Sequence, residues 1–345
     1  MRNRTIKRAE KQGLVETPKR IFNKRSAYAE ETISRELGKK YIEYRNKWVS
    51  ASARQIVTKF PLYLQIENVG KCNLHCPSCI QGIKELRDNY TKGMLPLSAK
   101  LFKNILTEAK KYRCPSISFH NNDEPLLLPD LEERISLARK AGFLDIILTT
   151  NATLLTKDRT LKLLEAGLTK INFSVDAFDE NDYHVKRPGG NFKQVLGNIS
   201  YFLNQKKIKK LKLPVTRVTC VLNKFGIKNM DKFYSFWKDR VDMVEFQNFQ
   251  AIKGYTEKFK PIKAKIDKKF ICNAPWQQLV IRPNGDVLPC CAFYGIDMVI
   301  GNIRKTSLYD IWNSGKMKLI RRELLMNNFD FSPACKKCSE TCYVL

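Results

Sequence analysis

The sequence predicts an α/β protein whose main part is an incomplete parallel barrel of six strand-helix units, written (βα)6. Six short apolar runs, typical of strands buried on both faces, lie between residues 61 and 250. Segments with the apolar spacing of helices separate these runs, for example 101–109 and 192–202. A complete TIM barrel has eight such units, so six units predict a partial, TIM-like barrel.

Residues 1–60, which precede the barrel, are basic and predict one or two amphipathic helices. Ile33, Leu37 and Tyr41 follow the helical period, and the segment carries no chemical motif. We therefore expect it to pack on the barrel in preference to binding a partner. No apolar run follows the basic start, and no stretch reaches the roughly 20 apolar residues of a membrane span, so a cytoplasmic location is expected.

The barrel itself is predicted over residues 61–264. Its expected strands are residues 61–69, 116–121, 145–151, 170–177, 215–223 and 244–250. In barrels of this kind the functional loops follow the carboxyl ends of the strands.

Residues 265–345 form the third predicted domain. The stretch QQLVIRPNGDVLPCC predicts a β-hairpin, because the Asn-Gly pair supplies the positive φ angles that a tight turn needs. A helix and a cysteine-rich tail follow it.

The formal charge of +28 would suit an anionic partner such as nucleic acid. The basic residues are spread along the chain, as in KKIKKLK at 206–212, without the interleaved aromatic residues of a base-stacking surface. A lysine-rich composition explains the charge, and nucleic-acid binding is not predicted.

The chain has eleven cysteines. Because thiols stay reduced in the cytoplasm, metal or iron-sulfur ligation is expected in place of disulfides. Nine of the cysteines lie in two groups, at 72–79 and 272–342, whereas Cys114 and Cys220 stand among apolar residues and are expected in the core.

The first group forms a C-x3-C-x2-C loop directly after the first strand, with Cys72, Cys76 and Cys79. Three thiolates leave one iron of a 4Fe-4S cluster free to bind another molecule. His75 is interpreted as a polar loop residue, because its neighbour Cys76 makes simultaneous ligation awkward. A zinc-binding loop is the alternative.

This loop and its position resemble the radical S-adenosylmethionine (radical SAM) superfamily over roughly residues 60–345. Ser78 departs from that family, where an aromatic residue commonly precedes the third cysteine. The resemblance implies that the free iron binds S-adenosylmethionine. It also implies that the reduced cluster cleaves this cofactor to a 5'-deoxyadenosyl radical, which abstracts hydrogen.

The resemblance implies cofactor-binding residues after strands two, three and four. The motif NNDEP replaces the family's Gly-Gly-Glu-Pro, and its glutamate is expected to face the cofactor's ammonium group. An arginine in a predicted loop with Tyr183 and His184 would clamp the carboxylate, although an incidental surface charge is the alternative. The implied residues are Asn122, Asp123, Glu124, Pro125, Asn151, Ser174, Asp176 and Arg187.

The second cysteine group resembles the SPASM and twitch extension of the same superfamily. It has too few cysteines for two fully ligated clusters, so one auxiliary 4Fe-4S cluster is expected. Its implied ligands are Cys272, Cys290, Cys335 and Cys338, with Cys342 as an alternative to either of the last two and Cys291 spare. A structural zinc ion is the alternative occupant.

Together these features predict a radical SAM oxidoreductase of the dehydrogenase type, which oxidises a small polar metabolite of the sugar or cyclitol type. The auxiliary cluster would accept the substrate electron, and a flavodoxin or ferredoxin would act as electron donor. A peptide- or protein-modifying maturase is the alternative, although residues 1–60 look too helical for the winged-helix region of such enzymes. A non-catalytic iron-sulfur or nucleic-acid-binding protein is a third hypothesis, against which the retained cofactor residues argue.

Overall fold

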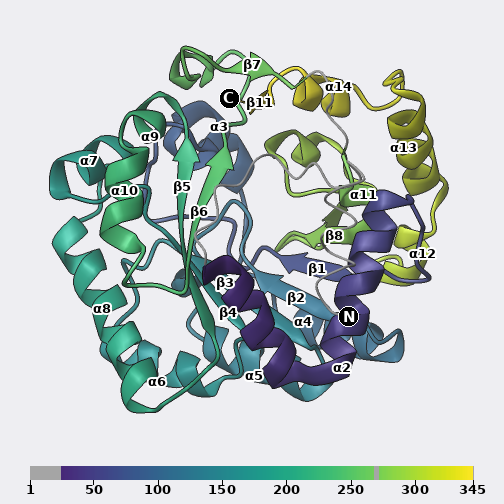
Figure 1. Cartoon of the computed structure of the whole chain (residues 1–345). Helices are drawn as coiled ribbons and strands as arrows, with labels where there is room; N and C mark the ends of the chain where they lie inside the picture. Colours follow the sequence, from purple (N-terminus) through teal and green to yellow (C-terminus); the bar gives the residue numbers. More distant parts are fainter. Residues whose placement is uncertain (1–24, 268–271, 345) are drawn as a thin grey trace.

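The computed structural model describes residues 25–267 and 272–344. The predicted six-stranded parallel barrel is confirmed, since each strand pairs in parallel with the next along the chain (Figure 1). The strands are β1 (Tyr63–Ile66), β2 (Ser116–Phe119), β3 (Asp145–Thr150), β4 (Lys170–Ser174), β5 (Val215–Leu222) and β6 (Met243–Asn248).

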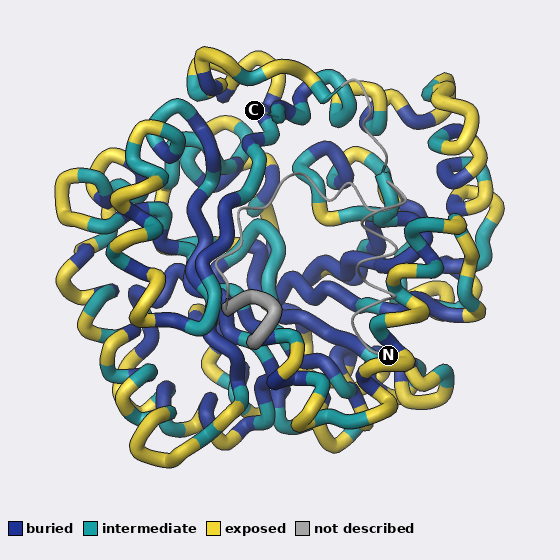
Figure 2. The backbone as a smooth tube through the Cα atoms, in the orientation of Figure 1, coloured by how far each residue is buried: buried dark blue, intermediate teal, exposed yellow. Residues whose placement is uncertain are grey.

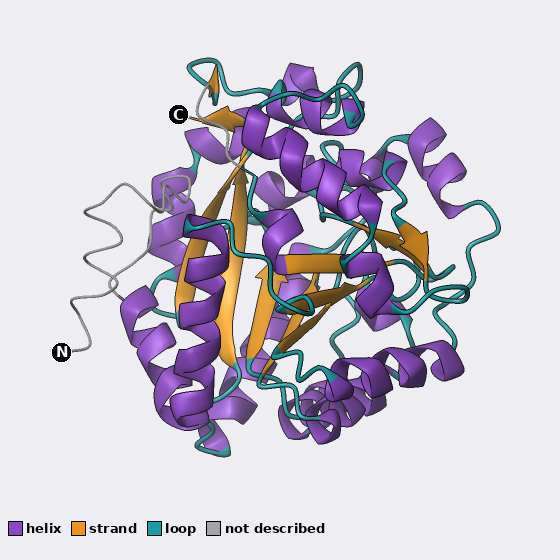
Figure 3. Cartoon of the chain, turned by 90° about the vertical axis from the view of Figure 1, so that its right-hand side faces the viewer, coloured by secondary structure: helices purple, strands orange, loops and turns teal. Residues whose placement is uncertain are grey.

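Helices cover the outer face of this sheet and enclose the strands (Figure 3). They include α4 (Ala99–Lys111), α5 (Leu131–Ala141), α6 (Lys157–Glu165), α7 (Glu180–Lys186), α8 (Phe192–Ile208), α9 (Lys224–Lys228) and α10 (Met230–Trp237). The helix α4 begins where the Ser98 hydroxyl accepts the Leu101 N–H, and its buried face meets the sheet where Phe102 contacts Phe119. The core therefore lies between the outer helices and the strands, and buried residues follow the strands in Figure 2.

The inner face of the sheet is polar. Successive side chains of a strand alternate between the two faces, and the strand register places Gln65 beside Ser118 and Asn172 beside Arg217. These residues alternate with the apolar ones that pack on the helices, so the barrel interior carries amide, hydroxyl and charged groups.

The helix α2 (Arg25–Ala53) packs against the amino-terminal ends of the strands. Its Tyr41 hydroxyl accepts a hydrogen bond at 3.1 Å from Lys170, the first residue of β4. Tyr41 also belongs to a small apolar cluster with Leu62 and Val215, which lie at the start of β1 and β5. This end of the barrel is thereby covered, which leaves the carboxyl ends of the strands for the functional loops.

The carboxyl-terminal region continues the barrel sheet at β1. After α11 (Ala274–Gln277), the predicted hairpin is present as β8 (Gln278–Ile281) and β9 (Asp286–Leu288), and its turn has Gly285 at φ 90°. The strand β8 pairs in parallel with β1, so the sheet has the order β10-β9-β8-β1-β2-β3-β4-β5-β6. The short β10 is Gly301–Asn302.

Three helices and a small sheet complete this region: α12 (Leu308–Trp312), α13 (Gly315–Met326), α14 (Pro333–Ser339), and the antiparallel pair β7 (Lys265–Ile266) and β11 (Tyr343–Val344). The tail therefore returns to the segment that follows the barrel. Cys114 and Cys220 are buried in the main core, as expected. Within the described ranges, no helix combines the length and apolar character needed to cross a bilayer.

Candidate functional site

The loop after β1 carries the first three cysteines on tightly folded backbone. Cys72, Cys76 and Cys79 are each partly buried, and the Cys79 N–H donates to the Cys76 carbonyl at 3.0 Å. Gly82 then passes so close that a Cβ atom there would lie 2.1 Å from the Cys76 carbonyl oxygen. The loop keeps this shape only because position 82 has no side chain.

The chemistry of these three thiols fits an iron-sulfur cluster. Burial raises the pKa of the Cys72 thiol to about 12 and that of the Cys76 thiol to about 11, and the charge of nearby Cys79 adds to both shifts. Three neighbouring thiols of this kind ionise together when iron is bound, because the metal stabilises thiolate. The donor set therefore suits a 4Fe-4S cluster held through three cysteines.

Two of the residues implied by the family resemblance contact this loop. The amide nitrogen of Asn151 lies 3.7 Å from the Cys72 sulfur and donates to Asn73 Oδ1 at 2.9 Å. The Nη1 atom of Arg187 lies 3.9 Å from the Cys76 sulfur. N–H groups that face sulfur stabilise the negative charge of an iron-sulfur centre.

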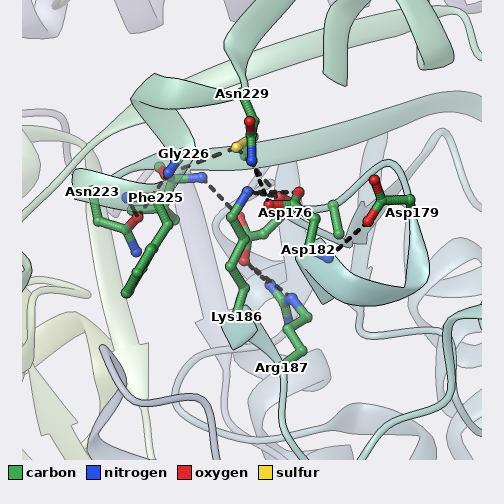
Figure 4. A network of polar contacts seen from close by, with 12 residues as sticks. Asp176, Asp179, Asp182, Lys186, Arg187, Asn223, Phe225, Gly226 and Asn229 are labelled. Atoms are coloured by element: carbon green, nitrogen blue, oxygen red, sulfur yellow. Dashed lines mark hydrogen bonds and ion pairs between the residues drawn. The ribbon is translucent and has the colours of Figure 1, made fainter. Parts of the chain in front are cut away.

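Arg187 is held in this place by Asp176, another implied residue. One carboxylate oxygen of Asp176 accepts from Arg187 Nε at 3.0 Å and from Nη2 at 2.6 Å, while the other accepts from the Val221 N–H at 2.7 Å. Asp176, two residues beyond the end of β4, adopts a positive φ of 61°. The strained turn thus aims its carboxylate at the guanidinium group, as Figure 4 shows.

A buried ion pair that the sequence did not point to supports this turn (Figure 4). Lys186 Nζ donates to the Asp176 carbonyl at 2.7 Å and to the Asp182 carboxylate at 2.8 Å, and Asn229 donates to the same carboxylate at 2.7 Å. The pair fixes α7 against the turn after β4 and against Asn229, which lies between α9 and α10. Its only signal in the sequence is the helical i,i+4 spacing of Asp182 and Lys186.

The segment of Tyr183 and His184 was predicted as a loop, and this prediction is wrong. These residues lie in α7, which forms because the Asp179 side chain accepts the Asp182 N–H at 2.8 Å and caps the helix. Tyr183 is buried and His184 is exposed. Arg187 follows at the end of the helix, so α7 sets its position.

The acidic residues of the NNDEP motif are turned into the protein. The Asp123 carboxylate accepts from the backbone N–H groups of Asn68 and Val69 at 2.7 and 2.8 Å. The Glu124 carboxylate accepts from the Thr150 hydroxyl and the Asn151 N–H, both at 2.7 Å. Burial raises their pKa values to about 6 and about 7. Glu124, expected to face the cofactor's ammonium group, therefore ties the end of β2 to β3 in this structure.

The other implied residues lie nearby at the ends of β2 and β4. The Asn122 carbonyl accepts from the side chain of Gln81 at 2.6 Å, a contact that joins the NNDEP motif to the cysteine loop. Pro125 begins a short 3-10 turn, and Ser174 is the last residue of β4. His75 Nδ1 lies 3.2 Å from the Gln81 carbonyl oxygen, within its own loop.

The second group of cysteines comes together from three places in the carboxyl-terminal region. Cys272 precedes α11, and Cys290 and Cys291 follow β9. The other members, Cys335, Cys338 and Cys342, lie on or after α14. Burial raises the pKa of Cys272 to about 12 and that of Cys335 to about 11, and the charge of Cys338 adds to both shifts. The interaction between the Cys338 and Cys342 thiols raises the pKa of Cys338 and lowers that of Cys342. Both remain candidates for the fourth ligand position.

In the part of the chain that the structure describes, no three histidine, cysteine or acidic side chains lie close enough to hold one metal ion. The thiolates of a 4Fe-4S cluster bind different iron atoms and are spaced more widely than the ligands of a single zinc ion.

A cavity of about 580 Å³ lies where the first cysteine loop meets the carboxyl-terminal region. Tyr90 and Arg282 line it, together with residues such as Phe293 and Lys337. Behind them the fully buried Glu67 accepts the Tyr90 hydroxyl at 2.5 Å and lies 3.6 Å from Arg282. Burial is the main cause that raises the Glu67 pKa to about 8. No sequence pattern indicates this group, because Glu67, Tyr90 and Arg282 are far apart in the chain.

Comparison with protein families gives two matches. The model of the radical SAM superfamily matches residues 69–236, and the model of an iron-sulfur cluster-binding domain, SPASM, matches residues 272–339. These ranges contain the first group of cysteines and all of the second group except Cys342.

Among curated proteins, the cofactor-modifying protein of the tungsten-containing aldehyde ferredoxin oxidoreductase from Pyrococcus furiosus is 24% identical over 330 residues, which is 80% of this chain and 87% of that protein. A probable GTP 3',8-cyclase from Methanococcus maripaludis is 35% identical over 153 residues, 44% of this chain and 49% of the cyclase. The chain thus spans about half the length of the cyclase.

Two solved structures share the fold. SuiB of Streptococcus suis, bound to S-adenosylmethionine, has a TM-score of 0.61 at 20% identity, over 80% of this chain and 71% of SuiB. BtrN in complex with AdoMet and 2-DOIA has a TM-score of 0.53 at 20% identity, over 78% of this chain and 88% of BtrN.

Proposed function

Because this chain belongs to the radical SAM superfamily and carries a SPASM-type iron-sulfur domain, we propose that it oxidises a small polar metabolite of the sugar or cyclitol type. A catalytic 4Fe-4S cluster, S-adenosylmethionine and an auxiliary iron-sulfur centre are its cofactors. When bound, the first two supply a carbon-centred radical that takes a hydrogen atom from a substrate C–H bond.

The residues proposed to hold the catalytic cluster are Cys72, Cys76 and Cys79. Asn151 and Arg187 border the same loop and are proposed to orient S-adenosylmethionine, the arginine through the carboxylate of the cofactor. Asp176 positions Arg187, and Glu124 keeps Asn151 in place through its backbone N–H. Backbone groups of the NNDEP segment are proposed to meet the ammonium group, because the Glu124 carboxylate already accepts hydrogen bonds from the protein.

One observation carries the proposal of an oxidation: both cysteine groups are attached to neighbouring strands. Cys72 follows β1, and the hairpin that leads to Cys290 begins with β8, the strand paired with β1. A cluster with four protein ligands has no open iron for substrate, so its suitable role is to accept an electron. Loss of an electron from the substrate favours net two-electron oxidation.

The polar inner face of the barrel supports a small polar substrate. Amide and hydroxyl groups of Gln65, Ser118 and Asn172 face the interior, and α2 covers the amino-terminal end. A substrate would then enter at the carboxyl ends of the strands, where the cysteine loop lies. The described residues 25–60 form α2 without a strand, which gives no support to a winged-helix peptide-binding region there.

The proposed function is tested with a panel of cyclitols and amino sugars, compared with a set of short peptides. The anaerobically reconstituted full chain receives S-adenosylmethionine, dithionite and one compound at a time. We expect one or more members of the first set to yield a carbonyl product together with an equal amount of 5'-deoxyadenosine. Product from the peptides alone would replace the proposal by a peptide-modifying function.

The electron donor is proposed to be a flavodoxin or a ferredoxin. Replacement of dithionite by either reduced protein in the same assay tests this, and failure of both would exclude them as donors for this enzyme.

A further inference from the structure

Gln250 connects the barrel to the cysteine-rich tail. It lies two residues beyond β6, and its backbone pairs with that of Cys342 as an antiparallel bridge. On either side, the Ala251 N–H donates to the Thr341 carbonyl at 3.0 Å, and the Tyr343 N–H donates to the Phe249 carbonyl at 3.1 Å. The Gln250 backbone is therefore fixed against the tail from both sides.

The packing around this bridge is also well defined. The rings of Phe249 and Tyr343 stack with their centroids 6.3 Å apart, and Ala251 completes the same small buried cluster. This packing restricts the directions in which the Gln250 side chain can point. The placement of the Gln250 amide is thus set by the join between barrel and tail.

The amide of Gln250 faces the sulfur atoms of two candidate cluster ligands. Its Nε2 lies 2.8 Å from the Cys338 sulfur and 3.6 Å from the Cys342 sulfur. A thiolate accepts hydrogen bonds and cannot donate one. When either sulfur binds iron, the N–H side of the amide is therefore the side that matches it.

We propose that Gln250 is a positioning residue that sets the reduction potential of the auxiliary cluster through an N–H···S hydrogen bond to Cys338. This inference rests on the proposed function, in which that cluster accepts the substrate electron. Reduction adds negative charge to the cluster and its sulfur ligands, and an N–H dipole directed at a ligand sulfur stabilises that charge. The hydrogen bond consequently raises the potential and favours electron uptake.

The position of Gln250 gives this hydrogen bond a further consequence. The residue belongs to the barrel, whereas the cysteines belong to the tail, so the contact forms only when the two parts are joined. The potential of the auxiliary cluster then depends on a correctly docked tail. A cluster in an undocked tail would be a poorer electron acceptor.

The test measures the auxiliary cluster alone. The full chain carrying Cys72→Ala, Cys76→Ala and Cys79→Ala is reconstituted anaerobically, which leaves about four irons in the auxiliary cluster. Its midpoint potential is measured by redox titration followed by electron paramagnetic resonance. Gln250→Met removes the N–H donors at similar size, and Gln250→Glu removes them and adds negative charge.

We expect the ratio of reduced to oxidised cluster at a fixed potential to fall at least tenfold in Gln250→Met, which is 59 mV for a one-electron couple. A larger fall is expected in Gln250→Glu. The matched variant Gln205→Met, on α8, should leave the potential unchanged.

The outcomes separate the two claims. If the parent chain binds no auxiliary cluster, the proposed function fails. If the cluster forms in all variants and its potential is the same in each, the proposed function stands and the role of Gln250 is excluded. If Gln250→Met loses its iron, the midpoint potential of the isosteric Gln250→Glu variant is compared with that of the parent chain. An unchanged potential in Gln250→Glu would overturn the inference.

Discussion

Asp176 holds Arg187 with two hydrogen bonds, 3.0 Å to Nε and 2.6 Å to Nη2, and leaves Nη1 directed at the first cysteine loop. The pair is largely buried, with 14% and 11% of the two side chains exposed. A charge pair of this kind fixes the direction of a guanidinium group, and removal of one partner frees it. Asp176 therefore acts on the cofactor site through Arg187.

The first prediction concerns this pair. In Asp176→Asn, we expect affinity for S-adenosylmethionine to fall about tenfold, since one lost charge-assisted hydrogen bond corresponds to roughly 1.4 kcal/mol. Arg187→Lys should give a similar loss, because lysine lacks the planar fork. Anaerobic equilibrium binding measures both. Asp231→Asn, at an exposed position on α10, is the control and should bind like the parent chain. If Asp176→Asn and Arg187→Lys also bound S-adenosylmethionine with the affinity of the parent chain, the role given to the pair would be refuted.

The second prediction concerns Gly82. A Cβ atom at this position would collide with the Cys76 carbonyl, so Gly82→Ala should displace the loop and reduce the iron content from about eight to about four per chain. Gly197 on α8 has no atom within 4 Å of an added Cβ. Gly197→Ala should keep all the iron and raise the free energy of unfolding by about 1 kcal/mol. Full iron content in Gly82→Ala would show that the close contact is not required.

The third prediction concerns the pH dependence of stability. Glu67 keeps its proton up to a pKa of about 8 in the folded chain, whereas its ordinary value is 4.5. Between these pH values the folded chain binds more protons than the unfolded chain at this group, so its contribution to stability falls as pH rises. Glu67→Gln should make the free energy of unfolding less dependent on pH in this window. Denaturant titrations from pH 5 to about pH 8 measure the slope, with the exposed Glu43→Gln as control.

If the slope of Glu67→Gln matched that of the parent chain across the window, Glu67 would not be protonated in the folded state. The buried contacts with Tyr90 and Arg282 would then hold a carboxylate.

The fourth prediction concerns the auxiliary ligands. Cys272→Ala and Cys290→Ala should each lower the iron content by up to about four per chain, because each variant lacks one of the four ligands of the auxiliary cluster. The exposed Cys291→Ala should retain all of it. The same iron analysis on Cys335→Ala, Cys338→Ala and Cys342→Ala identifies the remaining ligands. Loss of iron in Cys291→Ala but not in Cys290→Ala would reverse the assignment of that pair.

The barrel was predictable because the sequence patterns that indicate its strands and turns each lie within a short stretch of the chain. Each strand is a short apolar run, and the hairpin turn around Gly285 follows from residues next to it in the chain. The attachment of β8 to β1 was not predictable from the same patterns, because parallel pairing between residues such as Tyr63 and Gln278 leaves no periodic signal in either segment.

In the candidate site, too, local patterns were predictable and contacts between distant residues were not. The spacing of the cysteines indicated both groups, and the resemblance to a family indicated Asn151 and Arg187. Neither source could give the direction of a side chain, so the inward turn of Glu124 was not foreseen. The contact of Gln250 with Cys338 joins residues 88 positions apart and depends on how the tail docks.

The most direct test of the account is the formation of 5'-deoxyadenosine from S-adenosylmethionine by the reconstituted, dithionite-reduced chain. The parent chain and Cys272→Ala are compared with the variant that lacks Cys72, Cys76 and Cys79. We predict 5'-deoxyadenosine from the parent chain and from Cys272→Ala, and none from the triple variant. A parent chain that holds both clusters and does not cleave S-adenosylmethionine would contradict it, as would undiminished cleavage by the triple variant.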